Sequence, residues 1–264
     1  MRGAKVALAA ALFTAGVALA GSGIKGTKHD LSASNTNATV RSTTVDEICV
    51  FCHTPHHANP TFTGAPIWNK QEPEVAEFTM YGTTVAGTST DTAPNPPSLA
   101  CLSCHDGATA INALVNAPGP GYDGQGGGQD TSPVYVEITN GTQTWTEGTK
   151  VTMSDVSNYA ALGTDLRVHH PISITYTAPN ATADQNPASL RPVDTPLTGN
   201  WLVRDNNKDG SITIADLLRN GKVECPSCHD PHADNKPPTP VHPMFLRVEG
   251  GNKQSQLCLT CHAK

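Results

Sequence analysis

The chain has 264 residues and a formal net charge of −6 at pH 7. An acidic chain of this kind is poorly suited to binding nucleic acid or anionic lipid surfaces. Glycine and proline are abundant, with 23 and 21 residues, whereas aromatic side chains make up only 5% of the chain. This composition disfavours long helices and strands and argues against a conventional layered domain.

The first twenty residues have the form of a secretory signal peptide. Two basic residues precede an apolar run from Val6 to Leu19, and Ala18-Leu19-Ala20 forms a small-x-small cleavage site. We therefore assign residues 1–20 as a signal peptide and expect an exported mature chain. No cysteine stands at the cleavage site, which argues against a lipoprotein anchor. No later run approaches the roughly 20 apolar residues that a membrane span needs.

The next feature in chain order is a Cys-x-x-Cys-His string, which occurs four times and uses all eight cysteines. Two thiols three positions apart can add to the two vinyl groups of one haem, and the following histidine can then ligate its iron. A zinc knuckle or a thioredoxin-like redox pair would be the alternative for a single Cys-x-x-Cys, but four copies with adjoining histidines fit neither well. The predicted attachment sites are Cys49, Cys52 and His53; Cys101, Cys104 and His105; Cys225, Cys228 and His229; and Cys258, Cys261 and His262.

The spacing of these copies divides the mature chain. In each pair of copies the first continues as His-x-Pro-His and the second does not, so that Cys225 to His232 parallels Cys49 to His56. The chain therefore resembles two diverged halves. We predict one tetrahaem cytochrome c domain over residues 21–264, with a first haem pair in 41–110, a haem-free insert in 111–220 and a second haem pair in 221–264.

For the fold class we expect a multihaem cytochrome c that is mostly coil and is wrapped around a chain of stacked haems. Short helices should carry the attachment sites, and Gly107 should end the helix that holds His105. Within the insert, Val134 to Thr139 alternates in polarity and is followed by Asn140-Gly141 and a second short run. Because Asn-Gly between alternating runs is a strong hairpin signal, we predict one small β-hairpin there.

Four irons would each need a sixth ligand, and seven of the eleven histidines lie outside the proximal positions. His29, in the polar N-terminal arm, is the first candidate. His56 or His57 should reach a neighbouring haem, because the turn after His53 is too short to wrap around the porphyrin that His53 serves. The choice between His56 and His57 stays open.

A second histidine doublet, His169-His170, precedes Pro171. The proline biases His170 towards an extended backbone, which favours it as a rigidly presented ligand without excluding His169. His232 is a further candidate, and His242 is a spare one.

The insert also contains a stretch that resembles a calcium-binding loop. Residues 205–216 match the pattern D-x-[DN]-x-[DN]-G at their first six positions and end on an acid. The last position holds aspartate where glutamate normally binds bidentately, and a polar surface turn is the alternative interpretation. The predicted calcium ligands are Asp205, Asn207, Asp209, Ser211 and Asp216, with Ser211 acting through its carbonyl.

The pairing of C-x-x-C-H-x-P-H with a second C-x-x-C-H resembles the doubled C-x-x-C-H family of exported multihaem cytochromes c. The flanking strings Thr27-Lys28-His29-Asp30-Leu31-Ser32 and His170-Pro171-Ile172-Ser173 are similar to the outer-surface tetrahaem cytochromes of metal-reducing bacteria. This resemblance implies extracellular filaments in which a line of haems carries electrons and each iron has two histidines, one of which can come from the adjacent subunit. It also implies a distal set of His29, His56, His170 and His232.

Three functions are compatible with these residues. We expect an electron-transfer protein rather than an enzyme, and its predicted cofactors are four haem c groups and a calcium ion. It should be secreted, assemble as a head-to-tail homopolymer and pass electrons to other redox proteins or metal oxides. A soluble shuttle in the periplasm or outside the cell is the second hypothesis. A multihaem reductase is the third, and it would need one iron with an open face although the histidines suffice to saturate all four.

Overall fold

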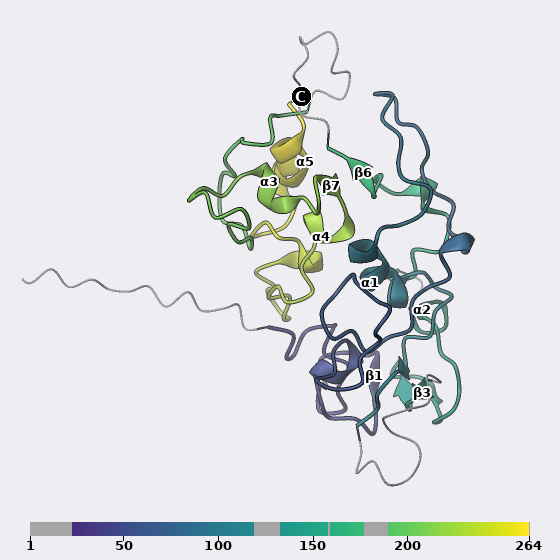
Figure 1. The fold of residues 1–264 in the computed structure, drawn as a ribbon. Helices are drawn as coiled ribbons and strands as arrows, with labels where there is room; N and C mark the ends of the chain where they lie inside the picture. The colour runs from purple at the N-terminus through teal and green to yellow at the C-terminus, as the bar shows by residue number, and fades with distance from the viewer. Residues whose placement is uncertain (1–22, 119–132, 158, 177–189, 264) are drawn as a thin grey trace, which may run out of the picture.

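The computed structural model describes residues 23–118, 133–157, 159–176 and 190–263 (Figure 1). The predicted signal peptide therefore lies outside the described residues. Most of the described chain is coil and turn, and its regular elements are short, as the composition predicts. No helix in these ranges is long and apolar enough to cross a membrane.

The longest helix in the described chain is α1 (Pro96–His105), with 10 residues. It begins after Asn95 with two prolines, whose fixed φ suits a first helical turn. Gly107 takes a φ of +75° just past its end, which confirms the predicted stop. The other described helices are α2 (Met153–Val156), α3 (Ile214–Leu217), α4 (Cys225–Cys228) and α5 (Gln256–Cys261), with the 3-10 helices η1 (Cys49–Phe51), η2 (Val75–Glu77), η3 (Leu166–Val168), η5 (Pro243–Phe245) and η6 (Lys253–Ser255).

Two-residue strands form three small antiparallel sheets among the described residues. Strands β4 (Ile138–Thr139) and β5 (Thr144–Trp145) form the predicted hairpin. Their register pairs Thr139 with Thr144, so four residues make the turn, with Gly141 at a φ of +85°. Strand β1 (Arg41–Ser42) pairs with β4, β2 (Ala113–Leu114) pairs with β3 (Val134–Tyr135), and β6 (Ile174–Thr175) pairs with β7 (Lys222–Val223).

The predicted hairpin is therefore present, but its first strand is shorter than the alternating run, and two further small sheets lie outside the prediction. Val134 and Tyr135 leave the hairpin and pair instead with the segment that follows Asn112. The Asn112 side-chain amide donates to the carbonyls of Val136 (2.8 Å) and Thr149 (2.9 Å) and so ties the two segments together. A short alternating run indicates a strand, but it does not define the strand's partner.

The apolar core of the described residues is divided into three small clusters, all within residues 45–166. The largest contains Leu99 and Leu102 from α1, together with Phe62, Trp68, Phe78 and Leu166. Cys52 packs against the first and second clusters, and Cys104 packs against the third. The protein atoms alone thus form no single continuous core, and the expected wrapping around haems stays a prediction.

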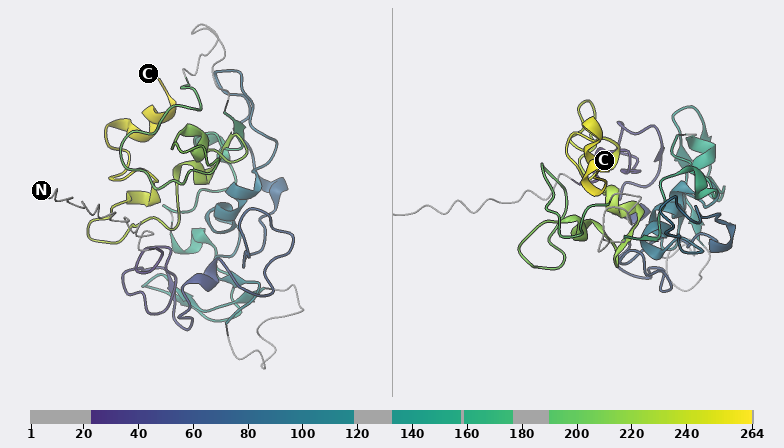
Figure 2. Two further views of the ribbon diagram at one scale, coloured as in Figure 1. Left: turned by 60° about the vertical axis from the view of Figure 1, so that its left-hand side comes forward. Right: turned by 90° about the horizontal axis from the view of Figure 1, so that it is seen from above.

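The four attachment segments follow one another along the molecule. In Figure 1, η1 lies near the bottom beside β1, α1 lies at the centre with α4 next to it, and α5 lies at the top. The left view of Figure 2 gives the same order, from the purple helix at the bottom to the yellow helix near the C-terminus. Helices α1 and α4 are in direct contact, although 119 residues separate His105 from Cys225 in the sequence.

Candidate haem-attachment sites

Each Cys-x-x-Cys pair lies on a short stretch of helix or at its end. The first pair lies on η1 and at its C-cap, the second in the last turns of α1, the third at the two ends of α4, and the fourth within α5. Residues three apart in a helical turn project from the same face, so each pair presents both sulfurs to one side. All eight cysteines are free of disulfide bonds. This arrangement suits two thioether bonds to one porphyrin.

Three of the four proximal histidines have one ring nitrogen already engaged. Nδ1 of His53 lies 2.8 Å from the carbonyl oxygen of Pro66, and Nδ1 of His105 lies 2.8 Å from that of Ala160. Nδ1 of His229 lies 2.9 Å from the carbonyl oxygen of Met244. Because a carbonyl only accepts, Nδ1 must carry the proton, which leaves the Nε2 lone pair available to a metal.

Three proximal histidines each face one of the histidines that the sequence predicts as distal ligands. The ring centroids of His53 and His232 are 6.4 Å apart. Those of His105 and His29 are 6.0 Å apart, and those of His262 and His170 are 6.5 Å apart. Every pair thus joins an attachment site to a histidine that is distant in the sequence.

These separations match the geometry of a metal held between two imidazoles. With a metal–nitrogen bond of about 2 Å on each side, the two ring centroids lie about 6 Å apart. The described residues contain no cluster of three or more His, Cys, Asp or Glu side chains that could hold a metal ion alone. The donor set therefore fits haem iron between two histidines better than a zinc knuckle.

The environment of His29 keeps its imidazole neutral. Its ring is half-buried and stacks on Phe245, with centroids 4.0 Å apart and an angle of 26° between the planes. Burial, followed by the nearby ring of His105, lowers the pKa of His29 to about 4. Its buried Nδ1 has no hydrogen bond of good geometry to a described residue, although the backbone of Pro231 lies close enough to oppose the fall in pKa. A neutral imidazole is the form that binds iron.

The fourth proximal histidine, His229, makes no such ring contact with another described histidine, although the rings of His29 and His105 lie near enough to interact with it. His56, the fourth predicted distal ligand, is exposed, as is His57, and neither ring contacts another described aromatic ring. In the second doublet it is His170 whose ring meets His262, whereas Nε2 of His169 lies 3.2 Å from the carbonyl oxygen of Leu162. The ligand assignments themselves stay predictions.

The spare candidate, His242, is also fixed by its own segment. Its Nδ1 lies 2.8 Å from the carbonyl oxygen of Leu246. Its ring contacts no other described aromatic ring. His242 therefore stays without an assigned iron.

Neighbouring attachment sites meet through their cysteines. Burial, followed by the nearby Cys104 thiol, raises the pKa of the Cys52 thiol to about 12. A hydrogen bond between Cys101 and Cys225 raises the pKa of the first and lowers that of the second. Burial, followed by the nearby Cys261 thiol, likewise raises the pKa of Cys228 to about 12. The first site therefore adjoins the second, the second adjoins the third and the third adjoins the fourth.

Three of the thiols do not fit the alternative of a redox-active cysteine pair, whereas a hydrogen bond with Cys101 lowers the pKa of Cys225. A reactive thiol needs a pKa low enough to form a thiolate near neutral pH. Burial acts in the opposite direction at Cys52, at Cys228 and at Cys261, whose pKa it raises to about 11.

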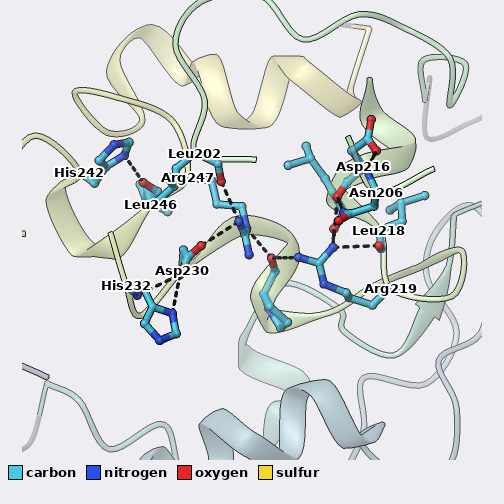
Figure 3. A network of polar contacts seen from close by, with 12 residues as sticks. Leu202, Asn206, Asp216, Leu218, Arg219, Asp230, His232, His242, Leu246 and Arg247 are labelled. Carbon is cyan, nitrogen blue, oxygen red and sulfur yellow. Dashed lines mark hydrogen bonds and ion pairs between the residues drawn. The ribbon is translucent and has the colours of Figure 1, made fainter. Parts of the chain in front are cut away.

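A polar network surrounds the third site and includes residues that sequence reasoning missed (Figure 3). Asp230 accepts hydrogen bonds from Nδ1 of His232 at 3.2 Å and from Nη1 of Arg247 at 3.0 Å. Burial would raise the pKa of Asp230, but the hydrogen bonds from His232 and the charge of Arg247 lower it to about 2. Arg247 stands 17 positions from Asp230, and no local pattern in the sequence marks it as a partner.

The predicted calcium loop forms a hydrogen-bonded turn. Asp205 accepts hydrogen bonds from the backbone N–H groups of Asp209 (3.2 Å) and Gly210 (2.8 Å). Asp216 is buried and serves as the third residue of a capping box with Thr213 at the start of α3. Asn207 and Asp209 bond to each other, and Asp209 accepts from the N–H of Ser211. The calcium assignment thus gains no support, since the polar-turn alternative accounts for these contacts.

Comparison with known proteins supports the cysteine-based interpretation. A family model described as the doubled CXXCH motif matches residues 218–264, less than a fifth of the chain. No curated protein matches the chain. The matched segment contains the third and fourth attachment strings. The match indicates a multihaem c-type cytochrome, a class of protein that binds haem covalently and transfers electrons.

Proposed function

We propose that this chain carries four c-type haems and transfers electrons as the subunit of a secreted, extracellular cytochrome filament of the outer-surface tetrahaem cytochrome E type. The observation that carries the proposal is the spacing of three histidine pairs, at 6.0, 6.4 and 6.5 Å, which two axial ligands of one iron require. When bound, each haem supplies an iron that gains and loses one electron. Iron with two protein ligands has no open position for a substrate, and electron transfer is the activity it retains.

The order of the sites supports conduction along the chain. The attachment cysteines adjoin one another from the first site to the fourth, and the first and last sites lie at opposite ends of the molecule (Figure 1). A head-to-tail contact between copies would then bring the last site of one subunit towards the first site of the next. A heterologous contact that does not close generates an open filament.

The histidine without a partner supports a ligand shared between subunits. The ring of His229 makes no contact with another described histidine ring like those of the other three proximal histidines, and His29, which lies near enough to interact with it, already faces His105. His56 is exposed and occupies the same place in its motif as His232, whose ring faces His53. We propose that His56 of one subunit completes the iron that His229 holds in the next.

The test compares His56→Ala with His57→Ala, a matched control because both side chains are exposed and adjacent. Both variants should keep four covalent haems by mass spectrometry. His56→Ala should show one high-spin ferric haem and no filaments under negative-stain microscopy, while His57→Ala should match the wild type. Filaments that persist in the His56→Ala variant would exclude His56 as the shared ligand.

The unpaired His229 also favours a second candidate, a multihaem reductase with one open iron. In that case the wild-type protein would stay monomeric, show one high-spin haem and bind carbon monoxide when reduced. A monomer with four low-spin haems would instead indicate the soluble electron shuttle.

A further inference from the structure

The ring of His232 is held differently from the other histidine rings. The Nδ1 atoms of His53, His105, His170, His229 and His242 each face a backbone carbonyl. Unlike these five rings, the ring of His232 meets a carboxylate, with its Nδ1 at 3.2 Å from Oδ1 of Asp230. The same oxygen accepts the backbone N–H of His232 at 2.9 Å, which fixes the carboxylate against the ring.

The carboxylate is in turn held by an arginine. Nη1 of Arg247 donates to Oδ2 of Asp230 at 3.0 Å and to the carbonyl of Leu202 at 2.7 Å. Nε of Arg247 donates to the carbonyl of Pro226 at 2.7 Å (Figure 3). The side chains of Arg247 and Asp230 are only 10% and 18% exposed, so water screens their charges weakly. Arginine and carboxylate therefore form a fixed pair, and the carboxylate holds the more exposed ring of His232 by its Nδ1.

A carboxylate behind an axial histidine changes the iron that the histidine ligates. A hydrogen bond from Nδ1–H to an anion makes the imidazole a stronger electron donor than a hydrogen bond to a neutral carbonyl does. A stronger donor stabilises the ferric state over the ferrous state, because the ferric ion carries the larger positive charge. The positive charge of Arg247 on the far side of Asp230 acts in the opposite direction.

We propose that Asp230 is a positioning residue that lowers the reduction potential of the first haem, the one attached at Cys49 and Cys52, through its hydrogen bond to His232. Arg247 limits the size of this effect. The inference rests on the proposed function, because it requires His232 and His53 to ligate the same iron. The reduction potential of the first haem would then depend on Asp230, a side chain that directly follows the third attachment string. The first and third haem sites would therefore be coupled.

The test measures the midpoint potential of each haem in holoprotein by spectroelectrochemistry, with individual haems resolved by their paramagnetically shifted proton signals. Asp230→Asn keeps an acceptor oxygen and removes the charge. It should raise the one-electron reduction equilibrium constant of the first haem at least tenfold, which corresponds to about 59 mV. Arg247→Gln should shift the same haem in the opposite direction. Two adjacent substitutions with opposite signs separate an electronic effect from simple loosening of the fold.

Asp106→Asn is the matched control. Asp106 directly follows the second Cys-x-x-Cys-His string, as Asp230 follows the third, but its carboxylate bonds to Ala108 and Thr109 rather than to a histidine. It should leave the low-spin ferric electron paramagnetic resonance signal of the first haem unchanged, whereas Asp230→Asn should shift the g-values of that signal.

Two different failures can be told apart. If Asp230→Asn leaves the potential and the g-values of the first haem unchanged while His232→Ala turns that haem high-spin, the inference about Asp230 is wrong and the ligation stands. If His232→Ala leaves the first haem low-spin, the proposed ligation by His232 is wrong, and the inference fails with it.

Discussion

Glu224 is the side chain whose removal should damage the described fold most clearly. It is buried, with 1% of its surface exposed, and directly precedes the third attachment string. Its carboxylate accepts hydrogen bonds from Nδ2 of Asn95 (2.9 Å), Oγ of Ser98 (2.5 Å) and Oγ of Ser173 (3.0 Å). One carboxylate therefore ties the start of α1 and the segment after His170 to the start of α4.

The expected magnitude follows from these three contacts. A hydrogen bond to a charged group contributes about 1.5–3 kcal/mol, and buried donors left without an acceptor cost about 1–3 kcal/mol each. Because the three bonds share one carboxylate, their losses do not add fully. Glu224→Ala should lower the free energy of unfolding by about 3–5 kcal/mol, a large part of the roughly 5–15 kcal/mol that holds a domain together. Glu224→Gln, which keeps one acceptor oxygen, should cost about half as much.

Denaturant unfolding of the holoprotein, followed by circular dichroism, measures this loss. Glu249→Ala is the control, because Glu249 is exposed and accepts one bond from Nδ2 of Asn200 at 2.6 Å. Its removal should change the free energy of unfolding by less than about 1 kcal/mol. If Glu224→Ala proved no more damaging than Glu249→Ala, the buried carboxylate would not hold the two attachment helices together.

Three further outcomes are expected. Leu102→Ala, at a side chain with 0% exposure, should cost about 2–5 kcal/mol in denaturant unfolding, and a loss below about 1 kcal/mol would contradict its place in the core. A hydrogen bond from Lys222 lowers the pKa of Asp91, and burial opposes this effect. The Asp91 carboxylate therefore stabilises the fold at pH values above its ordinary pKa of about 4, and this stabilisation is lost as the pH falls through the lowered pKa. Asp91→Asn should therefore cost up to about 1 kcal/mol at pH 7 and nothing at a pH well below 4, since the pair is partly exposed, and an equal cost at both pH values would oppose this. Asp205→Ala combined with Asp209→Ala should lower the thermal unfolding temperature equally with and without a chelator, and a chelator effect on the wild type alone would restore the calcium hypothesis.

The features that the sequence predicts well are those set by neighbouring residues. Gly107 ends α1 because only a residue without a side chain accepts φ near +75° easily. The turn around Asn140-Gly141 forms because Asn140 and Gly141 favour the tight backbone geometry that reverses the chain. The coil content follows from the abundance of glycine and proline. Each of these needs no knowledge of distant contacts.

Other features depend on contacts that no local pattern encodes. The pairing of His53 with His232 joins residues on opposite halves of the chain, and motif spacing gives candidates without giving partners. Asp216 shows a second use of a residue that the sequence pattern marks as a calcium ligand, because its carboxylate accepts a hydrogen bond from the backbone of Thr213 in a capping box; its calcium role stays a prediction. Lys70 is fully buried and donates to the carbonyls of Ile111 and Ala113. The sequence does not predict this burial, because a lysine in a turn-rich stretch is normally exposed.

The surroundings of Cys52 and Cys228, which are only partly exposed, bear on the order in which the holoprotein forms. Addition of a thiol to a vinyl group requires the sulfur to be accessible and favours the thiolate. In the folded chain, burial raises the pKa of Cys52 and of Cys228 to about 12, and Cys52 is already packed against two apolar clusters. Attachment to the folded chain would be slow at these positions, so haem addition should precede the final packing. Under the proposed function, the three small apolar clusters of the described residues would then close around porphyrins already in place.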